Sequence, residues 1–152
     1  MTMICHTTRY TEAVAVSSPS TNNSIKHFEE RIINRHSTPK RIVLDRGSAF
    51  TAKLFTDFAA KHGIELMFTP PNYHQPNGTC ERLNKTITEM LSKVCKKQTD
   101  WSRHVQEVAY KLNITCHSVT KKSPFFLLYG REPRLDIDNK LKPICTDLAD
   151  QN

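Results

Sequence analysis

The stretch RIVLDRGS at residues 41–48 decides the fold. An apolar run of three residues ends in an acid, and a turn that contains a glycine follows. Short apolar runs of this kind are typical of strands that are covered on both faces of a sheet. We therefore expect a buried central strand over residues 41–45, with Asp45 at the sheet edge where a ligand can reach it.

Upstream of this strand, an extended pattern gives way to a helical one. Residues 9–16 alternate as a strand does, and the SSP sequence that follows ends the alternation. Ser20 or Thr21 can cap a helix that runs to about His36, because apolar residues then recur at helical spacing. We expect one strand and one helix before the central strand.

Downstream of the strand, helical and extended patterns continue to alternate. Thr51 can cap a helix with Leu54, Phe55 and Phe58 turned inward, and Gly63 is typical of a helix end. The remaining expected elements are a strand at residues 64–68, a long helix from about Cys80 and a further helix from Trp101 to about Asn113.

The order of these elements predicts the fold class. Strand, helix, strand, helix, strand, helix, helix is typical of an α/β fold with one mixed sheet flanked by helices. We expect one domain over residues 1–135. Acids, a proline and polar residues mix over residues 136–152, which favours a weakly ordered tail.

Composition limits the kind of partner. The 152 residues fit one domain, and a hydrophobic fraction of 38% suffices for a core. The net charge of +7 and the pI near 9.3 favour a polyanion such as nucleic acid or an anionic membrane, although excess surface lysine on a soluble protein is the alternative. No apolar run is long enough to span a bilayer, so we expect no membrane partner.

The cysteines and the N-terminal residues indicate the cellular compartment. Five scattered cysteines without a CxxC pair favour reduced thiols over disulfides or structural zinc. The first residues lack the charged and apolar regions of a signal peptide. We expect an intracellular location, with the nucleus among the candidates.

Two acids stand where a ligand could reach them. Asp45 ends the expected strand, and Glu81 falls in the first turn of a helix, with 35 residues between them. Hard carboxylate ligands suit Mg²⁺ or Mn²⁺, and a pair of such ions promotes phosphoryl transfer. Two ions normally need more than two carboxylates, because one acid bridges both. The alternative is structural, since an acid in a first helical turn is also stabilised by the helix dipole.

Several motifs in order resemble a known family. They are DRGSAF at residues 45–50, TP at 69–70, YHQPNG at 73–78, ERLNK at 81–85, HSVT at 117–120 and SPFFLLYGREPR at 123–134. Together they are similar to the integrase catalytic core of gypsy-type retrotransposons and retroviruses, over roughly residues 4–135.

The resemblance implies an RNase H-like fold and a triad of two aspartates and a glutamate that bind Mg²⁺ or Mn²⁺. The second aspartate of the triad falls on Asp45 and the glutamate on Glu81. The implied activity is trimming the ends of element DNA and joining them to target DNA. The partners implied are DNA and, because such cores commonly dimerise, a second copy of the chain.

The first aspartate of the triad is missing at the position that the resemblance implies. The family places it just before a run like HTTRY, which here occupies residues 6–10, so the matching position holds Cys5. A thiol at its normal pKa is mostly protonated and is a soft ligand that suits zinc better than magnesium. Glu12 lies seven positions further on and is not expected to take the vacant place. We therefore expect weak two-metal binding and impaired strand transfer.

The beginning of the chain also departs from the family. The family's first strand extends several residues upstream and a zinc-binding domain precedes it, so we expect a truncated first strand. A decayed element or a wrong gene boundary would each account for this.

Other residues are candidates for contact with DNA. Lys85 lies four positions after Glu81 on the same helix face and could meet a phosphate. The resemblance places Tyr73, His74, Gln75 and Asn77 in a loop that flanks the active site and touches DNA. A solvated helix face and an ordinary loop are the structural alternatives.

Three hypotheses follow: an integrase core, a nucleic-acid-binding remnant that has lost catalysis, and an unrelated basic adaptor that binds protein. The series of motifs disfavours the adaptor. Cys5 favours the hypothesis of a remnant that has lost catalysis, and it leaves the family resemblance unchanged.

Overall fold

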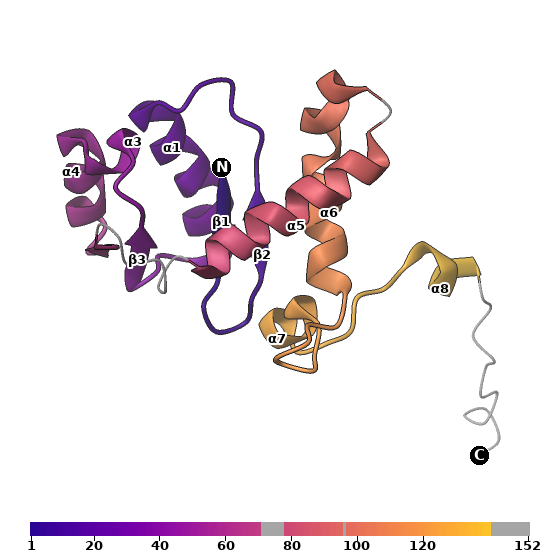
Figure 1. Cartoon of the computed structure of the whole chain (residues 1–152). Coiled ribbons are helices and arrows are strands. Elements are labelled where there is room, and N and C mark those ends of the chain that lie inside the picture. The colour runs from indigo at the N-terminus through magenta and orange to yellow at the C-terminus, as the bar shows by residue number, and fades with distance from the viewer. Residues whose placement is uncertain (71–77, 96, 141–152) are drawn as a thin grey trace, which may run out of the picture.

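A computed structural model describes residues 1–70, 78–95 and 97–140 (Figure 1). The strands are β1 (Thr2–Ile4), β2 (Thr11–Ala13), β3 (Arg41–Leu44) and β4 (Glu65–Phe68). The helices are α1 (Thr21–Phe28), the π-helical η1 (Glu29–Ile33), α2 (Asn34–His36), α3 (Ser48–Thr51), α4 (Lys53–Lys61), α5 (Gly78–Val94), the 3-10 turn η2 (Gln98–Asp100), α6 (Trp101–Ile114), α7 (Pro124–Tyr129) and α8 (Asp136–Lys140).

The strands form two pairs. β1 and β2 are antiparallel, and β3 and β4 are parallel. The expected α/β class and the mixed strand directions are therefore present. Among the described residues, however, the pairs are two separate two-stranded sheets rather than one continuous sheet.

The helix expected between residues 20 and 36 is present, with a widened turn inside it. The side chain of Ser20 accepts a bond of 3.2 Å from the N–H of Asn23, which satisfies one of the unpaired donors of the first turn. The segment Glu29–Ile33 is π-helical, and the N–H of Asn34 bonds back to the carbonyl of Glu29. A π turn holds one more residue than an α turn, so it changes which faces point inward beyond it.

The expectation that β3 is a buried central strand is wrong. Only Leu44 is buried, and Val43 is 49% exposed. The physical reason is that β3 has one hydrogen-bonded neighbour, β4, among the described residues. A strand that is paired on one side only leaves the backbone of its other edge without a covering strand.

Two details of the next helix also differ from expectation. Thr51 does not cap it, because this residue ends α3, and Ala52 opens α4 without a side-chain bond. Leu54 is 51% exposed and not turned inward. The buried stripe of α4 follows Phe55 and Ala59 instead, which lie one helical turn apart, and Leu54 lies at its solvent margin. Gly63 does end the helix, with a φ of 66°.

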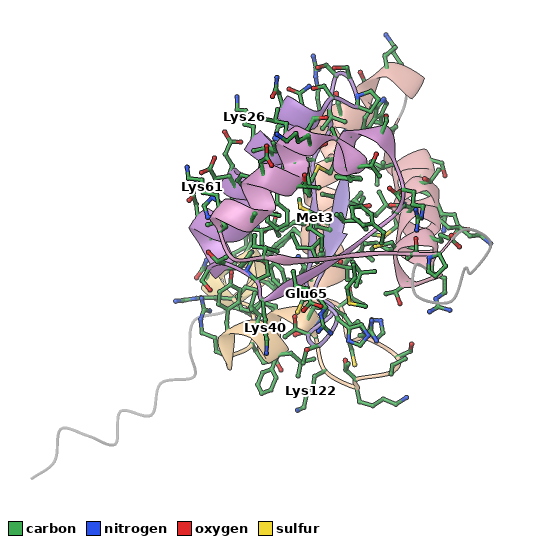
Figure 2. All side chains as sticks on the ribbon, turned by 90° about the vertical axis from the view of Figure 1, so that its left-hand side faces the viewer. Met3, Lys26, Lys40, Lys61, Glu65 and Lys122 are labelled. Atoms are coloured by element: carbon green, nitrogen blue, oxygen red, sulfur yellow. The ribbon has the colours of Figure 1, made fainter. Side chains whose placement is uncertain are left out.

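Apolar side chains gather in two clusters on opposite sides of β1. The first cluster joins α5 and α6 to β2, with Leu83, Ile87, Val108 and Ala13 among its buried members, and Ile4 packs against it. The second cluster joins α1, α4 and the parallel strands. Its members are Phe28, Ala59 and Ile64, with Met1, Met3, Ile32, Ile33, Ile42, Phe58 and Leu66 packed against them. Met3 lies at the centre of the molecule in Figure 2, whereas Lys26 and Lys61 extend to its edge.

The C-terminal part adds a short helix that ends in a defined turn. Ser123 caps α7 by accepting a bond from the N–H of Phe126 at 3.0 Å, and Pro124 occupies its first turn. Gly130 follows with a φ of 70°. The last helix, α8, lies apart from the rest of the molecule, and all of its residues are exposed (Figure 1). The remainder of the expected tail lies outside the described residues.

Candidate functional site

Asp45 lies directly after β3 and is exposed. Its Oδ1 accepts a bond of 3.0 Å from the backbone N–H of Gly47, which forms a local turn. A Cβ atom on residue 47 would lie 2.9 Å from that oxygen. The glycine therefore leaves room for the carboxylate in its present position.

Glu81 lies in the first turn of α5, beside Cys80. Burial raises the pKa of the Cys80 thiol, and the negative charges of Asp45 and Glu81 raise it further. A charge has this effect only over a short distance, so both carboxylates lie near Cys80. The fold thus brings together two acids that have 35 residues between them in the sequence.

A cavity of about 800 Å³ joins the three positions of the predicted triad. Asp45, Glu81 and Cys5 all line it. Asn84 and Cys80 line it too, and neither was predicted to belong to the site. The signal for Asn84 was its spacing, since a residue three positions after Glu81 shares its helix face.

The thiol of Cys5 is more acidic than expected. Burial alone raises the pKa of this thiol, but hydrogen bonds from the side chain and backbone of Thr8 and from the backbone of Thr7, together with the charge of Arg9, outweigh it and hold the pKa below its usual value. The expectation of a thiol with a normal pKa is therefore wrong. Sulfur nevertheless stays a soft ligand in either protonation state.

The donor set falls short of what a pair of hard divalent ions needs. Within residues 1–70, 78–95 and 97–140, no group of three or more His, Cys, Asp or Glu side chains is placed to hold a metal ion. Asp45 and Glu81 offer oxygen ligands that suit Mg²⁺ or Mn²⁺, and Cys5 offers sulfur. The residues present therefore do not fit a two-ion site.

Glu12 takes part in a different interaction. It lies on β2, and its Oε1 is 3.1 Å from Nε2 of His36 and 3.9 Å from Arg35. Its side chain is 12% exposed. Glu12 lines the same cavity but is paired with α2, which agrees with the expectation that it does not replace the missing acid.

Of the residues that were expected to contact DNA, Lys85 is the one that lies within the described residues. It is exposed on α5, and its Nζ lies 4.0 Å from the carboxylate of Glu89. An exposed pair at this distance leaves the lysine accessible to a phosphate. Tyr73, His74, Gln75 and Asn77 lie outside the described residues. None of the described helices is both long enough and apolar enough to cross a bilayer.

Comparisons with known proteins bear on the sequence family and on the fold. Residues 1–74 match the family of the integrase core domain. The Tf2-3 and Tf2-4 transposon polyproteins of Schizosaccharomyces pombe are each 30% identical to this chain over 137 residues. That alignment covers 89% of this chain and 10% of each polyprotein, so the chain spans about a tenth of the length of these relatives.

Two solved structures share the fold. The HTLV-2 integrase catalytic core domain, in a trimeric form in complex with magnesium, has a TM-score of 0.71 at 17% identity, with 84% of this chain and 82% of that chain covered. The simian T-cell lymphotropic virus intasome in complex with a PP2A regulatory subunit has a TM-score of 0.73 at 17% identity, with 94% of this chain and 51% of that chain covered. The chain therefore has the RNase H-like fold of integrase catalytic cores.

Proposed function

We propose that this chain acts on DNA in the integration of a retroelement, with an impaired joining step. In support, residues 1–74 match the integrase core domain family, and the chain has the fold of integrase catalytic cores. The observation that carries the proposal is the cavity beside β1 that Asp45 and Glu81 both line. Carboxylates held in one cavity are the arrangement that metal-dependent phosphoryl transfer uses.

The proposed impairment follows from the ligands. Asp45 and Glu81 would supply oxygen ligands to Mg²⁺ or Mn²⁺, and a bound ion would polarise a phosphoryl oxygen in this chemistry. The position assigned to a third acid holds Cys5, whose sulfur is a poor ligand for a hard ion even as a thiolate. We propose weakened metal binding as the cause of a slow joining step.

DNA is the proposed partner because of charge and accessibility. The net charge of +7 favours a polyanion, and exposed lysines such as Lys85 can replace the counterions of phosphates. We expect binding to oligonucleotide DNA to weaken as salt rises. Self-association is a further proposal, since the HTLV-2 core is described in a trimeric form.

The test is a joining assay on oligonucleotides with Mg²⁺ or Mn²⁺, comparing the parent chain with Cys5→Asp. We expect little joining by the parent and at least about tenfold more by Cys5→Asp, since an added carboxylate restores a hard ligand. The matched control is Cys116→Asp, a change at another exposed cysteine that does not line the cavity. Robust joining by the parent would contradict the proposed impairment.

The second candidate is a nucleic-acid-binding remnant without catalytic activity. It is supported by the absence, among the described residues, of a group of three or more side chains that could hold a metal ion. Titration with Mn²⁺ separates the two candidates. Micromolar binding that is lost in Asp45→Asn and in Glu81→Gln supports an enzyme. DNA binding that persists in both variants without any metal binding supports the remnant.

A further inference from the structure

A short segment around α7 carries a large share of the positive charge of the chain. Residues 117–134, here called the α7 surface, hold four cations and one acid, a net charge of +3 out of the +7 of the whole chain. All four cations are exposed: Lys121, Lys122, Arg131 and Arg134. Lys122 lies at the lower edge of the molecule in Figure 2, whereas Lys26 lies toward its upper edge. The excess charge is therefore concentrated in one part of the surface.

Aromatic rings, rather than carboxylates, hold two of these cations. Nζ of Lys122 lies 4.9 Å from the ring centroid of Phe126, and the guanidinium carbon of Arg131 lies 5.2 Å from that of Phe125. Both distances are within the range of cation–π attraction. A ring orders a cation without cancelling its charge, so each of these two groups keeps its full charge for a ligand.

Several exposed cations elsewhere are paired with acids. Nζ of Lys111 lies 2.7 Å from the carboxylate of Glu107, and Arg41 lies 2.9 Å from that of Glu65. In the part of the chain that the structure describes, no such ion pair involves any of the four cations of the α7 surface. An anionic ligand would therefore not have to displace a carboxylate in order to reach them.

The loop before α7 is closed by its own hydrogen bonds. The backbone N–H of His117 donates to the carbonyl oxygen of Lys122 at 3.0 Å, and that of Lys121 donates to the carbonyl oxygen of His117 at 2.9 Å. The hydroxyl of Thr120 also donates to the carbonyl oxygen of Lys122, at 3.0 Å. A loop that is held at several points needs little further ordering when a ligand binds, which lowers the cost of binding.

The α7 surface lies beside the cavity that Asp45 and Glu81 line, and not inside it. Tyr129 of α7 contacts Tyr10, which follows the turn between β1 and β2, with ring centroids 5.9 Å apart (Figure 1). Leu128 lines the cavity, whereas none of the four cations does. The cations therefore lie outside the place that the proposed function gives to the metal ion.

We propose that the α7 surface binds the phosphate backbone of duplex DNA at a second site, outside the cavity of Asp45 and Glu81; that DNA is the partner comes from the proposed function. Lys and Arg side chains attract phosphates whatever the base sequence, so this site would bind without sequence preference. The six residues of α7 span about 9 Å, so cations before and after the helix can contact separate phosphates of one strand.

The rings of the α7 surface favour a duplex over a single strand. Proteins that bind single strands stack the bases on free aromatic rings. Here Phe125 and Phe126 each face a cation, and the ring of Tyr129 contacts that of Phe125, with centroids 4.6 Å apart. The rings are therefore engaged within the protein, which leaves contact with phosphates as the mode of binding.

The test measures the binding of the full chain to a labelled duplex oligonucleotide by fluorescence anisotropy, over a series of salt concentrations. EDTA is present, so that divalent ions in the cavity do not contribute. The double variant Lys122→Gln, Arg131→Gln should bind at least about tenfold more weakly. The slope of log K against log salt should fall by about 2, because two phosphate contacts are lost.

The matched control is the double variant Lys26→Gln, Lys61→Gln. It removes the same charge from exposed positions of α1 and α4. Since it changes only the overall field of the protein, its affinity should fall less than about threefold.

A further double variant, Phe125→Leu with Phe126→Leu, tests the role of the rings. It keeps every charge but removes the ring faces on which Lys122 and Arg131 lie. Affinity should fall about three- to tenfold with an unchanged salt slope, because the cations are present but less ordered. Equal affinity in this variant and the parent would overturn the role of the rings. If the variant does not fold, the two charge variants decide alone.

The outcomes separate this site from the proposed function. Absence of salt-dependent binding by the parent chain would overturn DNA as the partner, and the site with it. Binding by the parent that persists unchanged in Lys122→Gln, Arg131→Gln, or that falls equally in the control, would overturn the site alone. Tighter binding of single-stranded DNA or RNA of the same length would overturn the assignment of a duplex.

Discussion

Gly47 has no Cβ atom, and the Asp45 carboxylate lies close to the place where that atom would be. We expect Gly47→Ala to displace the Asp45 carboxylate, because the added carbon would lie 2.9 Å from Oδ1. Mn²⁺ affinity should fall by about tenfold or more, as is typical when the support of a metal ligand is disturbed. Isothermal titration calorimetry measures this change.

The stability of the same variant should not fall. Gly47 has a φ of −58° and a ψ of 141°, which alanine adopts without strain, so the free energy of unfolding should stay within about 1 kcal/mol. Gly78→Ala is the control, since a Cβ there meets nothing within 4 Å. Equal Mn²⁺ affinity in the parent and in Gly47→Ala would contradict the prediction that a Cβ atom at residue 47 displaces the Asp45 carboxylate.

Tyr10 gives the chain a dependence on alkaline pH. Burial, then a hydrogen bond with Tyr129 and the charges of Tyr129 and Glu12, raise the pKa of the Tyr10 phenol well above its ordinary value. An unfolded tyrosine ionises near pH 10, so the neutral phenol stabilises the folded state fully below about pH 10. That contribution is lost as the pH rises from there toward the folded pKa.

Tyr10→Phe removes the group that must ionise. Its free energy of unfolding should therefore fall less steeply above about pH 10 than that of the parent. Urea denaturation at a series of pH values measures the slope. Identical slopes in the two proteins would contradict the assigned origin of the alkaline loss.

At the scale of elements, one buried amide joins α6 to β2. The side chain of Asn113 accepts from the N–H of Thr11 at 2.7 Å and donates to its carbonyl oxygen at 2.8 Å. Asn113→Ala would leave both backbone groups buried without partners, so we expect a loss of about 3 kcal/mol in the free energy of unfolding. Chemical denaturation measures this loss.

The matched control is Asn84→Ala, which removes an exposed bond of 2.6 Å between α5 and Thr2 of β1. Water can replace an exposed bond, so the expected loss is below about 1 kcal/mol. Similar losses in the two variants would mean that Asn113 does not connect the helix to the strand as described.

The elements that the sequence predicts well are those with local signals. Ser20 caps the helix that begins at Thr21, and Gly63 ends α4 with a positive φ, as their residue types indicate. β1 has three residues, too few for a pattern to repeat. The capping serine and the glycine that frame α7 were visible, at Ser123 and Gly130, but no helix was predicted between them.

Burial was predicted less well, because it depends on neighbours that are distant in sequence. The apolar run at β3 resembles a central strand, yet Val43 is half exposed because one edge of β3 faces a cavity. The same holds for the site. Spacing indicated Asp45 and Glu81, but only the fold shows that Cys80 and Asn84 line the cavity with them.

At the scale of the whole molecule, β1 connects two apolar clusters. Ile4 packs against the cluster of α5 and α6, and Met3 packs against the cluster of α1 and α4. We therefore expect the chain to unfold in one transition, with equal midpoints from far-ultraviolet circular dichroism and from the fluorescence of Trp101, the single tryptophan.

Met3→Ala should lower both midpoints together. The free energy of unfolding should fall by about 1–2 kcal/mol, because the methionine is partly buried. Urea denaturation followed by the two signals measures this effect. Two separate transitions in the parent would show that the clusters unfold independently, and β1 would then not couple them.

The π turn at Glu29–Ile33 matters for how sequences of different length are compared. It holds one residue more than an α turn would, and each helical residue turns the chain by about 100°. Deleting one residue there would turn the π turn into an α turn and leave His36 at nearly the same rotation, close to Glu12, its partner at 3.1 Å. An alignment with a relative that has a straight helix should therefore place its one-residue gap inside this helix rather than in the neighbouring loop, and a length difference in the middle of a helix need not signal a sequencing error.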